Sequence, residues 1–269
     1  MGQEIVRALA EAGCKVIMTS EHKSRLYAAA DKIRAVSNLI EVIPADLSLM
    51  AETNRFADNI LASGEPITFI MNNAGAMPPK PTVTNEGFEY TVAVNYLSPY
   101  LLTRKLLPLM SAGSRIVSMT SCTHRIGKIK SNFFTGGGRY RRICVYSNTK
   151  YALTLFTVKL AALLKDKNIS VNAADPWIVS TDMIRMDAWF DKLTDIFFRP
   201  FIYTPKQGAA TAIHLLLAKD IAHTGCIFAD GKRKDTGKRY INNPDVQKLW
   251  DDTETVLKAK TGIALPAIE

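Results

Sequence analysis

Two side chains that could transfer a proton lie four residues apart in the middle of the chain. Three residues, 147–149, separate Tyr146 from Lys150. On a helix this spacing puts both side chains on one face. A free phenol has a pKa of about 10. A neighbouring ammonium that stabilises the phenolate lowers that pKa toward the working range of a general acid or base. The pair is therefore a candidate for acid–base chemistry, although exposed helices also carry this spacing without any function.

Other polar residues follow apolar runs that have the character of buried strands. Ser121 comes just after the run 115–119, and the amides and glycine of 72–75 come just after the run 67–71. Asn95 lies near the start of a long segment with helical periodicity. Parallel strands end at one edge of a sheet, where ligands of such folds bind. We therefore expect these groups to gather around the tyrosine.

The elements that must position these residues alternate regularly along the chain. Strand-like runs and segments with helical periodicity take turns, which is typical of a doubly wound parallel sheet. The sequence therefore predicts an α/β, Rossmann-like fold in a single domain over 1–269, with 189–204 as an apolar insertion and a tail beyond Val256. The strands are expected at 15–18, 39–43, 67–71, 115–119, 169–173 and 226–228, and the helices at 4–12, 24–35, 51–62, 92–110, 146–165 and 205–218.

The composition narrows the class of protein. The 269 residues are 47% hydrophobic and 22% charged, as in ordinary globular chains. No apolar run approaches the roughly 18 residues of a membrane span, and no secretory signal opens the chain, so we expect a cytoplasmic protein without stable membrane insertion. The 34 Lys and Arg exceed the 25 Asp and Glu, which favours anionic ligands. The basic runs are short and far apart, so no nucleic-acid partner is predicted.

The four cysteines do not indicate a metal site. No CxxC spacing and no paired histidines accompany them, and we expect reduced, mostly buried thiols. Cys122 with His124 could form a thiol nucleophile and its base, but packing within the loop after Ser121 is the interpretation we favour. The cysteines are Cys14, Cys122, Cys144 and Cys226.

Taken in order, these motifs resemble those of the short-chain dehydrogenases/reductases, and within them the retinol-dehydrogenase-like group. The resemblance covers residues 2 to about 257, and several ordered motifs make it specific. It implies an NAD(P)-dependent oxidoreductase that interconverts a carbonyl and an alcohol, with a small-molecule substrate and a possible homo-oligomer. The motifs are Asn72 to Gly75, Glu86 to Glu89 before Val94 and Asn95, Ser121, Tyr146 with Lys150, Pro176 to Thr181, and Gly208 to Ala210 before Thr224 and Gly225.

The resemblance also implies roles for individual residues. Tyr146 would give or take the proton at the substrate oxygen, and Lys150 would lower its pKa and bind the nicotinamide ribose. Ser121 would hydrogen-bond the carbonyl, and Asn95 would hold its helix and a water relay. The implied cofactor-binding residues are Gly2, Ser20, Asp46, Leu47, Asn73, Ala74, Gly75, Lys150, Pro176, Val179 and Thr181.

The chain departs from the family pattern at its beginning. The printed sequence opens on a helix, and Gly2 resembles the last glycine of a turn whose preceding strand and earlier glycines are absent. We therefore expect an N-terminally truncated Rossmann-like fold in which two strands near Val16 and Phe69 are unpaired and the dinucleotide binds weakly. The alternative function is a non-catalytic remnant of the family that binds a partner or ligand without turnover.

Two further departures concern the ligands. Trp177 stands where the family has glycine, and it could crowd the nicotinamide or line the substrate pocket. Ser20 lacks the carboxylate that a ribose diol needs and Glu21 stands where phosphate-binding relatives often carry arginine, whereas Lys23 and Arg25 could serve a phosphate. The cofactor is therefore NADP or NAD, with NADP slightly favoured. Five aromatic residues within 187–201 would form either a lid over a lipophilic substrate or a satellite core, and the sequence leaves both open.

Overall fold

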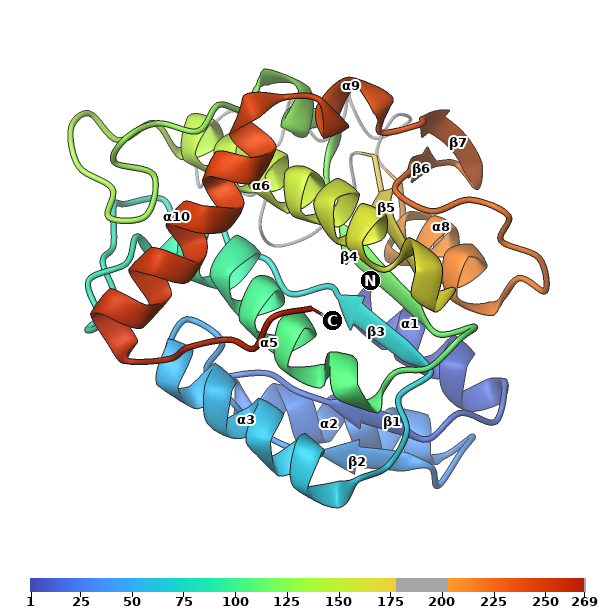
Figure 1. Ribbon diagram of the computed structural model, residues 1–269. Coiled ribbons are helices and arrows are strands. Elements are labelled where there is room, and N and C mark those ends of the chain that lie inside the picture. Colours follow the sequence, from blue (N-terminus) through green and yellow to red (C-terminus); the bar gives the residue numbers. More distant parts are fainter. Residues whose placement is uncertain (178–202, 269) are drawn as a thin grey trace, which may run out of the picture.

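The computed structural model describes residues 1–177 and 203–268, in which strands alternate with helices (Figure 1). The strands lie close to the positions that the apolar runs predict, and β7 is additional. Their bounds are β1 (Val16–Met18), β2 (Ile40–Val42), β3 (Phe69–Asn72), β4 (Arg115–Met119), β5 (Ser170–Asp175), β6 (Ile227–Ala229) and β7 (Lys232–Asp235).

The main sheet aligns the ends of its strands at one edge. Its order is β3-β4-β5-β6-β7, in which β3 to β6 are parallel and β7 is antiparallel to β6. Asn72 stands opposite Ser118, and Met119 stands opposite Ala174. The residues that follow β3, β4 and β5 therefore emerge side by side, as the α/β, Rossmann-like prediction requires.

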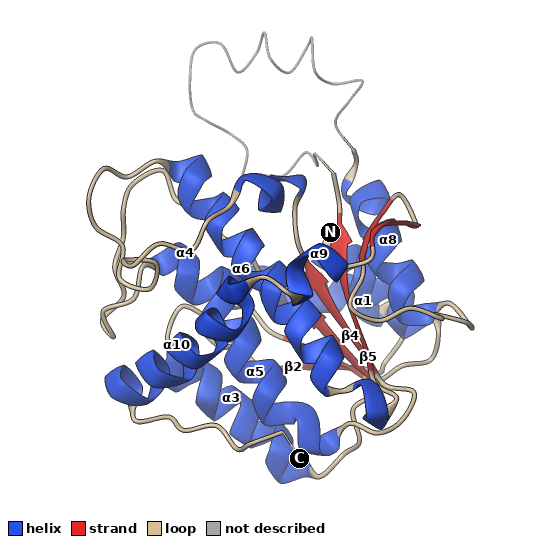
Figure 2. Ribbon diagram, turned by 45° about the horizontal axis from the view of Figure 1, so that its top comes forward, coloured by secondary structure: helices blue, strands red, loops and turns tan. Residues whose placement is uncertain are grey.

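Helices cover both faces of this sheet (Figure 2). Alternate residues of β4 point to opposite faces: Ile116 packs in the core that contains α3, α5, α6 and α10, and Val117 packs in the core that contains α1 and α8. The helices are α1 (Gly2–Glu11), α2 (Lys23–Arg34), α3 (Met50–Ser63), α4 (Tyr90–Val92), α5 (Ser98–Leu106), α6 (Arg142–Leu163), α8 (Pro205–Leu217), α9 (Lys238–Ile241) and α10 (Pro244–Thr261).

The segment predicted as one helix over 92–110 is divided in the structure. A π-helical turn, η1 (Ala93–Leu97), separates α4 from α5, and a 3-10 turn, η2 (Leu107–Leu109), follows α5. Wide π turns occur often at functional sites. This one carries Asn95 and Tyr96, both of which are buried.

The expectation of a tail beyond Val256 is wrong. That residue lies inside α10, which packs across α5 and α6 through Trp250, and the segment after α10 continues along the core (Figure 1). The buried positions Val246, Leu249, Trp250 and Leu257 recur at helical spacing, so the helix was detectable from the sequence. Within residues 1–177 and 203–268, no helix is long and apolar enough to cross a bilayer.

The sheet is interrupted between β1 and β3. In the described chain β1 pairs with β2 alone, and β3 pairs with β4 alone. The Val16 N–H donates to the Leu39 carbonyl at 2.8 Å, so the backbone groups of Val16 face β2. The backbone groups of the next residue, Ile17, point in the opposite direction, away from β2. The side chains of Val16 and Phe69 nevertheless pack against the same core. The break lies where the resemblance predicts two unpaired strands.

We expect a parallel strand placed in this break to stabilise the protein. In the variant, the first strand and glycine-rich turn of a short-chain dehydrogenase/reductase of known structure are added before Met1. The added strand would form backbone hydrogen bonds with β1 and β3 and would bury apolar area between them. The melting temperature, measured by calorimetry, should rise by about 5 °C or more. An extension of equal length made of glycine and serine is the control. Equal melting temperatures for the two extended proteins would show that β1 and β3 do not accept a strand.

Candidate functional site

A close contact between a loop and a helix brings Ser121 near Tyr146. Ser121 follows β4 and opens the 3-10 turn η3 (Cys122–Ile126), which packs along α6. A Cβ atom built on Gly127 would lie 2.4 Å from both the Ser147 carbonyl oxygen and the Tyr151 Cβ. Any residue with a side chain would push the turn away from α6, so glycine is required here for steric reasons.

The Tyr146 phenol holds its proton firmly. Burial raises its pKa to about 12, and the charges of Asp175 and Cys122 act in the same direction, while the Ser121 hydroxyl lowers it. The pKa of Tyr146 is therefore raised, and not lowered as its spacing from Lys150 predicts. The reason is desolvation, which outweighs the neighbouring polar groups.

Lys150 lies one helical turn further along α6, in the interior. Only 3% of the residue is exposed, and its Nζ donates to the Met119 carbonyl oxygen at 2.8 Å. The same nitrogen is 5.5 Å from the centre of the Tyr146 ring. Burial lowers the Lys150 pKa to about 8, so this amine changes charge near physiological pH. Tyr146 and Lys150 do share one face of the helix, as their spacing predicts.

Asn95 joins three elements at the sheet edge. Its Oδ1 accepts from the Ala76 N–H at 2.6 Å, and its Nδ2 donates to the Ala76 carbonyl and to the Thr149 hydroxyl, both at 3.0 Å. The side chain is fully buried. It therefore fixes the loop after β3 against η1 and against α6, three residues after Tyr146.

The residues at the start of α1 and after β1 and β3 fit an anionic ligand. A Cβ on Gly2 would lie 2.8 Å from the Asn73 Nδ2, so the N-terminal amides of α1 lie beside the loop after β3. Among the described residues the Oδ1 of Asn73 and the Oγ1 of Thr19 are buried without a partner. Unpaired buried acceptors and a helix N-terminus are suited to ribose hydroxyls and a pyrophosphate, which is the cofactor chemistry that the resemblance implies. Ala74 and Gly75 continue this loop; Thr19 was missed, although it directly follows a predicted strand.

A cavity of about 340 Å³ lies where the adenine end is expected. Of the residues expected here, Asp46 lines the cavity. Leu47 is partly buried against the core that contains α3, α5, α6 and α10. Ser20 does not line the cavity, and its hydroxyl accepts the His22 N–H at 3.3 Å. His22, Glu52 and Arg55 also line the cavity. They come from separate segments with no common spacing, so no pattern in the sequence identifies them. The lining residues are Glu21, His22, Lys23, Pro44, Ala45, Asp46, Glu52 and Arg55.

The end of β5 forms the opposite side of the site. Asp175 is buried and accepts the Trp177 N–H at 3.0 Å, and Pro176 lies between them. Trp177 has φ of +62° and is 48% exposed, so a bulky residue occupies a backbone conformation that suits glycine. Val179 and Thr181 lie outside the described residues, as does the apolar insertion up to residue 202.

The alternative of a cysteine nucleophile has little support in the geometry. Burial raises the pKa of the Cys122 thiol and lowers that of His124, so the thiolate is disfavoured. The His124 Nδ1 lies 2.6 Å from the Ser121 carbonyl oxygen, and the imidazole is buried in the loop. Throughout the described ranges, no group of three or more His, Cys, Asp and Glu could hold a metal ion.

Comparisons with known proteins show which proteins this chain is similar to. The family model described as short chain dehydrogenase matches residues 1–189. Human retinol dehydrogenase 12 is 32% identical over 256 residues, which cover 93% of this chain and 81% of that protein. Mouse polyprenol dehydrogenase is 30% identical over 236 residues, which cover 84% of this chain and 70% of that protein. A short chain dehydrogenase from Burkholderia cenocepacia in complex with NADP has a similar fold, with a TM-score of 0.70 at 22% identity over 85% of this chain and 90% of that one.

The buried amine predicts a characteristic dependence of stability on pH. The unfolded chain keeps the Lys150 proton up to about pH 10.5, but the folded chain keeps it only up to about pH 8. Between these values the unfolded state binds more protons, so this group makes the free energy of unfolding rise with pH. Relative to Lys150→Met, the wild type should gain on the order of 3 kcal/mol across this interval.

Urea unfolding at pH 7, 8, 9 and 10 measures this difference. Lys159→Met, at a partly exposed position of the same helix, controls for the loss of one positive charge from α6. Parallel stability profiles for the wild type and Lys150→Met would show that the Lys150 amine is not desolvated.

Proposed function

We propose, from the premise that the chain belongs to the short-chain dehydrogenase family, that it interconverts an alcohol and a carbonyl on a lipophilic substrate with NADP as the preferred cofactor. The observation that carries this proposal is the meeting of Ser121, Tyr146 and Lys150 at the edge where β3, β4 and β5 end. These groups supply a proton, a hydrogen bond to oxygen and a neighbouring amine.

Each of these residues has a distinct part in the proposed reaction. The Tyr146 hydroxyl gives its proton to the substrate oxygen during reduction, and its raised pKa keeps that proton in place at neutral pH. The Ser121 hydroxyl holds the same oxygen while charge develops there. The bound nicotinamide cofactor supplies the hydride. Lys150 stands beside the phenol and can bind a ribose hydroxyl through its remaining protons.

The preference for NADP rests on the cavity after β1. His22, Lys23 and Arg55 provide cationic or ionisable groups there, beside the carboxylates of Glu21 and Asp46. A phosphate on the adenosine ribose would be attracted to the cationic groups. Solved structures with this fold contain NADP or NADPH, which supports the same choice.

The names of the relatives and two exposed apolar residues support the proposed substrate class. The relatives are named for retinol and polyprenol, which are lipophilic alcohols. Ile126, at the end of η3, and Ile143, three residues before Tyr146, are 67% and 57% exposed. Both residues are close in the chain to Ser121 or Tyr146, and large exposed apolar side chains are suited to contact a substrate with a long hydrocarbon part.

Tyr146→Phe should separate proton transfer from cofactor binding. The variant lacks the phenolic hydroxyl but keeps the ring and the cofactor residues, so kcat for reduction of retinaldehyde should fall by about 100-fold or more. The dissociation constant for NADPH, measured by fluorescence titration, should change by less than about twofold. The assay follows NADPH consumption with retinaldehyde and with a polyprenal.

Tyr140→Phe is the matched control, since the Tyr140 hydroxyl donates to the Pro78 carbonyl at 2.7 Å on the loop before α6. It should keep its activity. Full activity of Tyr146→Phe would contradict the assigned proton transfer. NADPH binding by a wild type that turns over neither aldehyde would favour a binding protein instead.

A further inference from the structure

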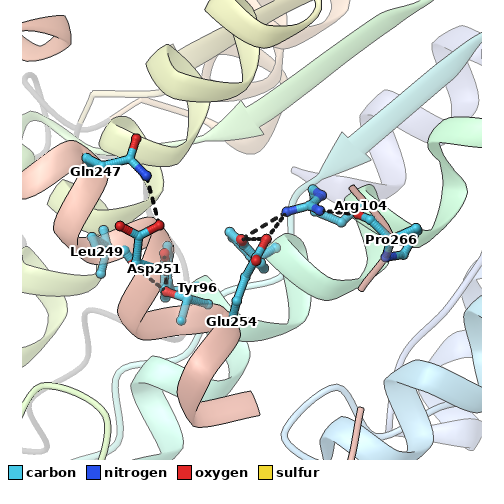
Figure 3. Close-up of polar contacts among 9 residues, drawn as sticks. Tyr96, Arg104, Gln247, Leu249, Asp251, Glu254 and Pro266 are labelled. Atoms are coloured by element: carbon cyan, nitrogen blue, oxygen red, sulfur yellow. Dashed lines mark hydrogen bonds and ion pairs between the residues drawn. The ribbon is translucent and has the colours of Figure 1, made fainter. Parts of the chain in front are cut away.

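Helix α10 is held against η1, which carries Asn95, and against the following helix α5. The contacts come from three successive turns of η1 and α5. Tyr96, Tyr100 and Arg104 are spaced four residues apart, so they form one stripe along η1 and α5. The Tyr96 hydroxyl lies 2.8 Å from the Thr253 Oγ1, and Arg104 donates to Glu254 at 2.6 Å (Figure 3).

The far end of this stripe also holds the segment after α10. The Arg104 guanidinium donates to the Pro266 carbonyl at 2.5 Å and lies 4.7 Å from the centre of the Trp250 ring. Tyr100 meets the same indole at 5.1 Å between ring centres. These contacts bury a cation that is only 3% exposed, and such a cation is stable only with its partners in place.

The near end of the stripe lies beside the site. Asn95 and Tyr96 are consecutive residues of the π turn and point in different directions: Asn95 points to Ala76 and Thr149, and Tyr96 points to α10. Tyr96 is 1% exposed and Thr253 is fully buried. Thr253 in turn donates to the Leu249 carbonyl at 2.5 Å, which leaves the threonine hydroxyl with few other orientations.

We propose that Tyr96 is a positioning residue for Asn95, and that its hydrogen bond to Thr253 makes α10 a brace for the π turn. The inference rests on the proposed function, because the contacts of Asn95 fix the loop after β3 against α6, the helix that carries Tyr146 and Lys150. A π turn accommodates one more residue per turn than an α-helix. Asn95 lies inside this turn, so a change of the turn to α-helical spacing would move its side chain relative to Ala76 and Thr149.

Two conservative variants remove this hydrogen bond from either side. Tyr96→Phe keeps the ring that packs 5.7 Å from Phe133, and Thr253→Val keeps the volume of its side chain. Each should lower kcat about tenfold and change the KM for NADPH by less than about twofold. The double variant should lose no more than either single variant, because both remove the same contact.

The decisive measurement does not need turnover. Exchange of the Asn95 side-chain amide protons with deuterated water is followed by NMR of protein labelled with nitrogen-15 on asparagine, and Asn95→Asp assigns the signal. Both variants should speed this exchange about tenfold, while the backbone amides of β4 keep their rates. This readout still tests the brace if the protein reduces neither retinaldehyde nor a polyprenal, in which case only the proposed function fails.

Gln247→Ala is the matched control on the same helix. Gln247 donates to Asp251 at 2.8 Å on the exposed face of α10 (Figure 3), so its loss should leave the Asn95 exchange and kcat as they are. Unchanged Asn95 exchange in both Tyr96→Phe and Thr253→Val would overturn the proposal. Equal acceleration of the β4 amides would overturn it too, since the contact would then serve general stability alone.

Discussion

The geometry of the site depends on one buried hydrogen bond, from the Lys150 amine to the Met119 carbonyl. Met119 ends β4 and Lys150 lies within α6, so this bond fixes the helix against the edge of the sheet. Ser121 comes shortly after Met119 in the chain, and Tyr146 lies one helical turn before Lys150 on α6. An ammonium in the interior is costly unless it is paired. The fold therefore keeps a destabilising group at its centre, as is common where proton chemistry takes place.

Burial acts on both members of the tyrosine and lysine pair, and it favours the neutral form of each. It raises the pKa of Tyr146 to about 12 and lowers that of Lys150 to about 8. The spacing of the two residues in the sequence gives their shared helix face, which the structure confirms. It does not give the depth at which that face is buried. The charge of a neighbouring amine therefore does not predict the direction in which the Tyr146 pKa shifts, because desolvation is a property of the tertiary structure.

The same distinction explains which parts of the fold were predictable. The strand β4 was predictable because the apolar character of the run 115–119 belongs to that segment alone. The close contact of Gly127 with α6 was not predictable, because it depends on how two distant segments pack. The apolar spacing over 92–110 predicts one continuous α-helix and does not reveal the π turn that divides it. The turn is held open by contacts of Asn95 and Tyr96 with distant residues, and no local pattern encodes these. Thr19, His22 and Arg55 were missed for the same reason.

The two halves of the site differ in how they are held. The acid–base half lies on β4, β5 and α6, which are joined by continuous strand pairing and by the Lys150 hydrogen bond. The residues suited to a dinucleotide lie on both sides of the break: Thr19 follows β1, and Asn73 follows β3. In the described chain no strand pairing connects β1 with β3; side-chain packing and the ion pair of Lys15 with Glu65 hold their segments together. Such contacts without a ladder permit local opening at lower free energy. A ligand that contacts both sides stabilises the folded state by mass action. Cofactor binding and stability are therefore coupled most strongly at this break, whereas the proton-transfer geometry depends little on it.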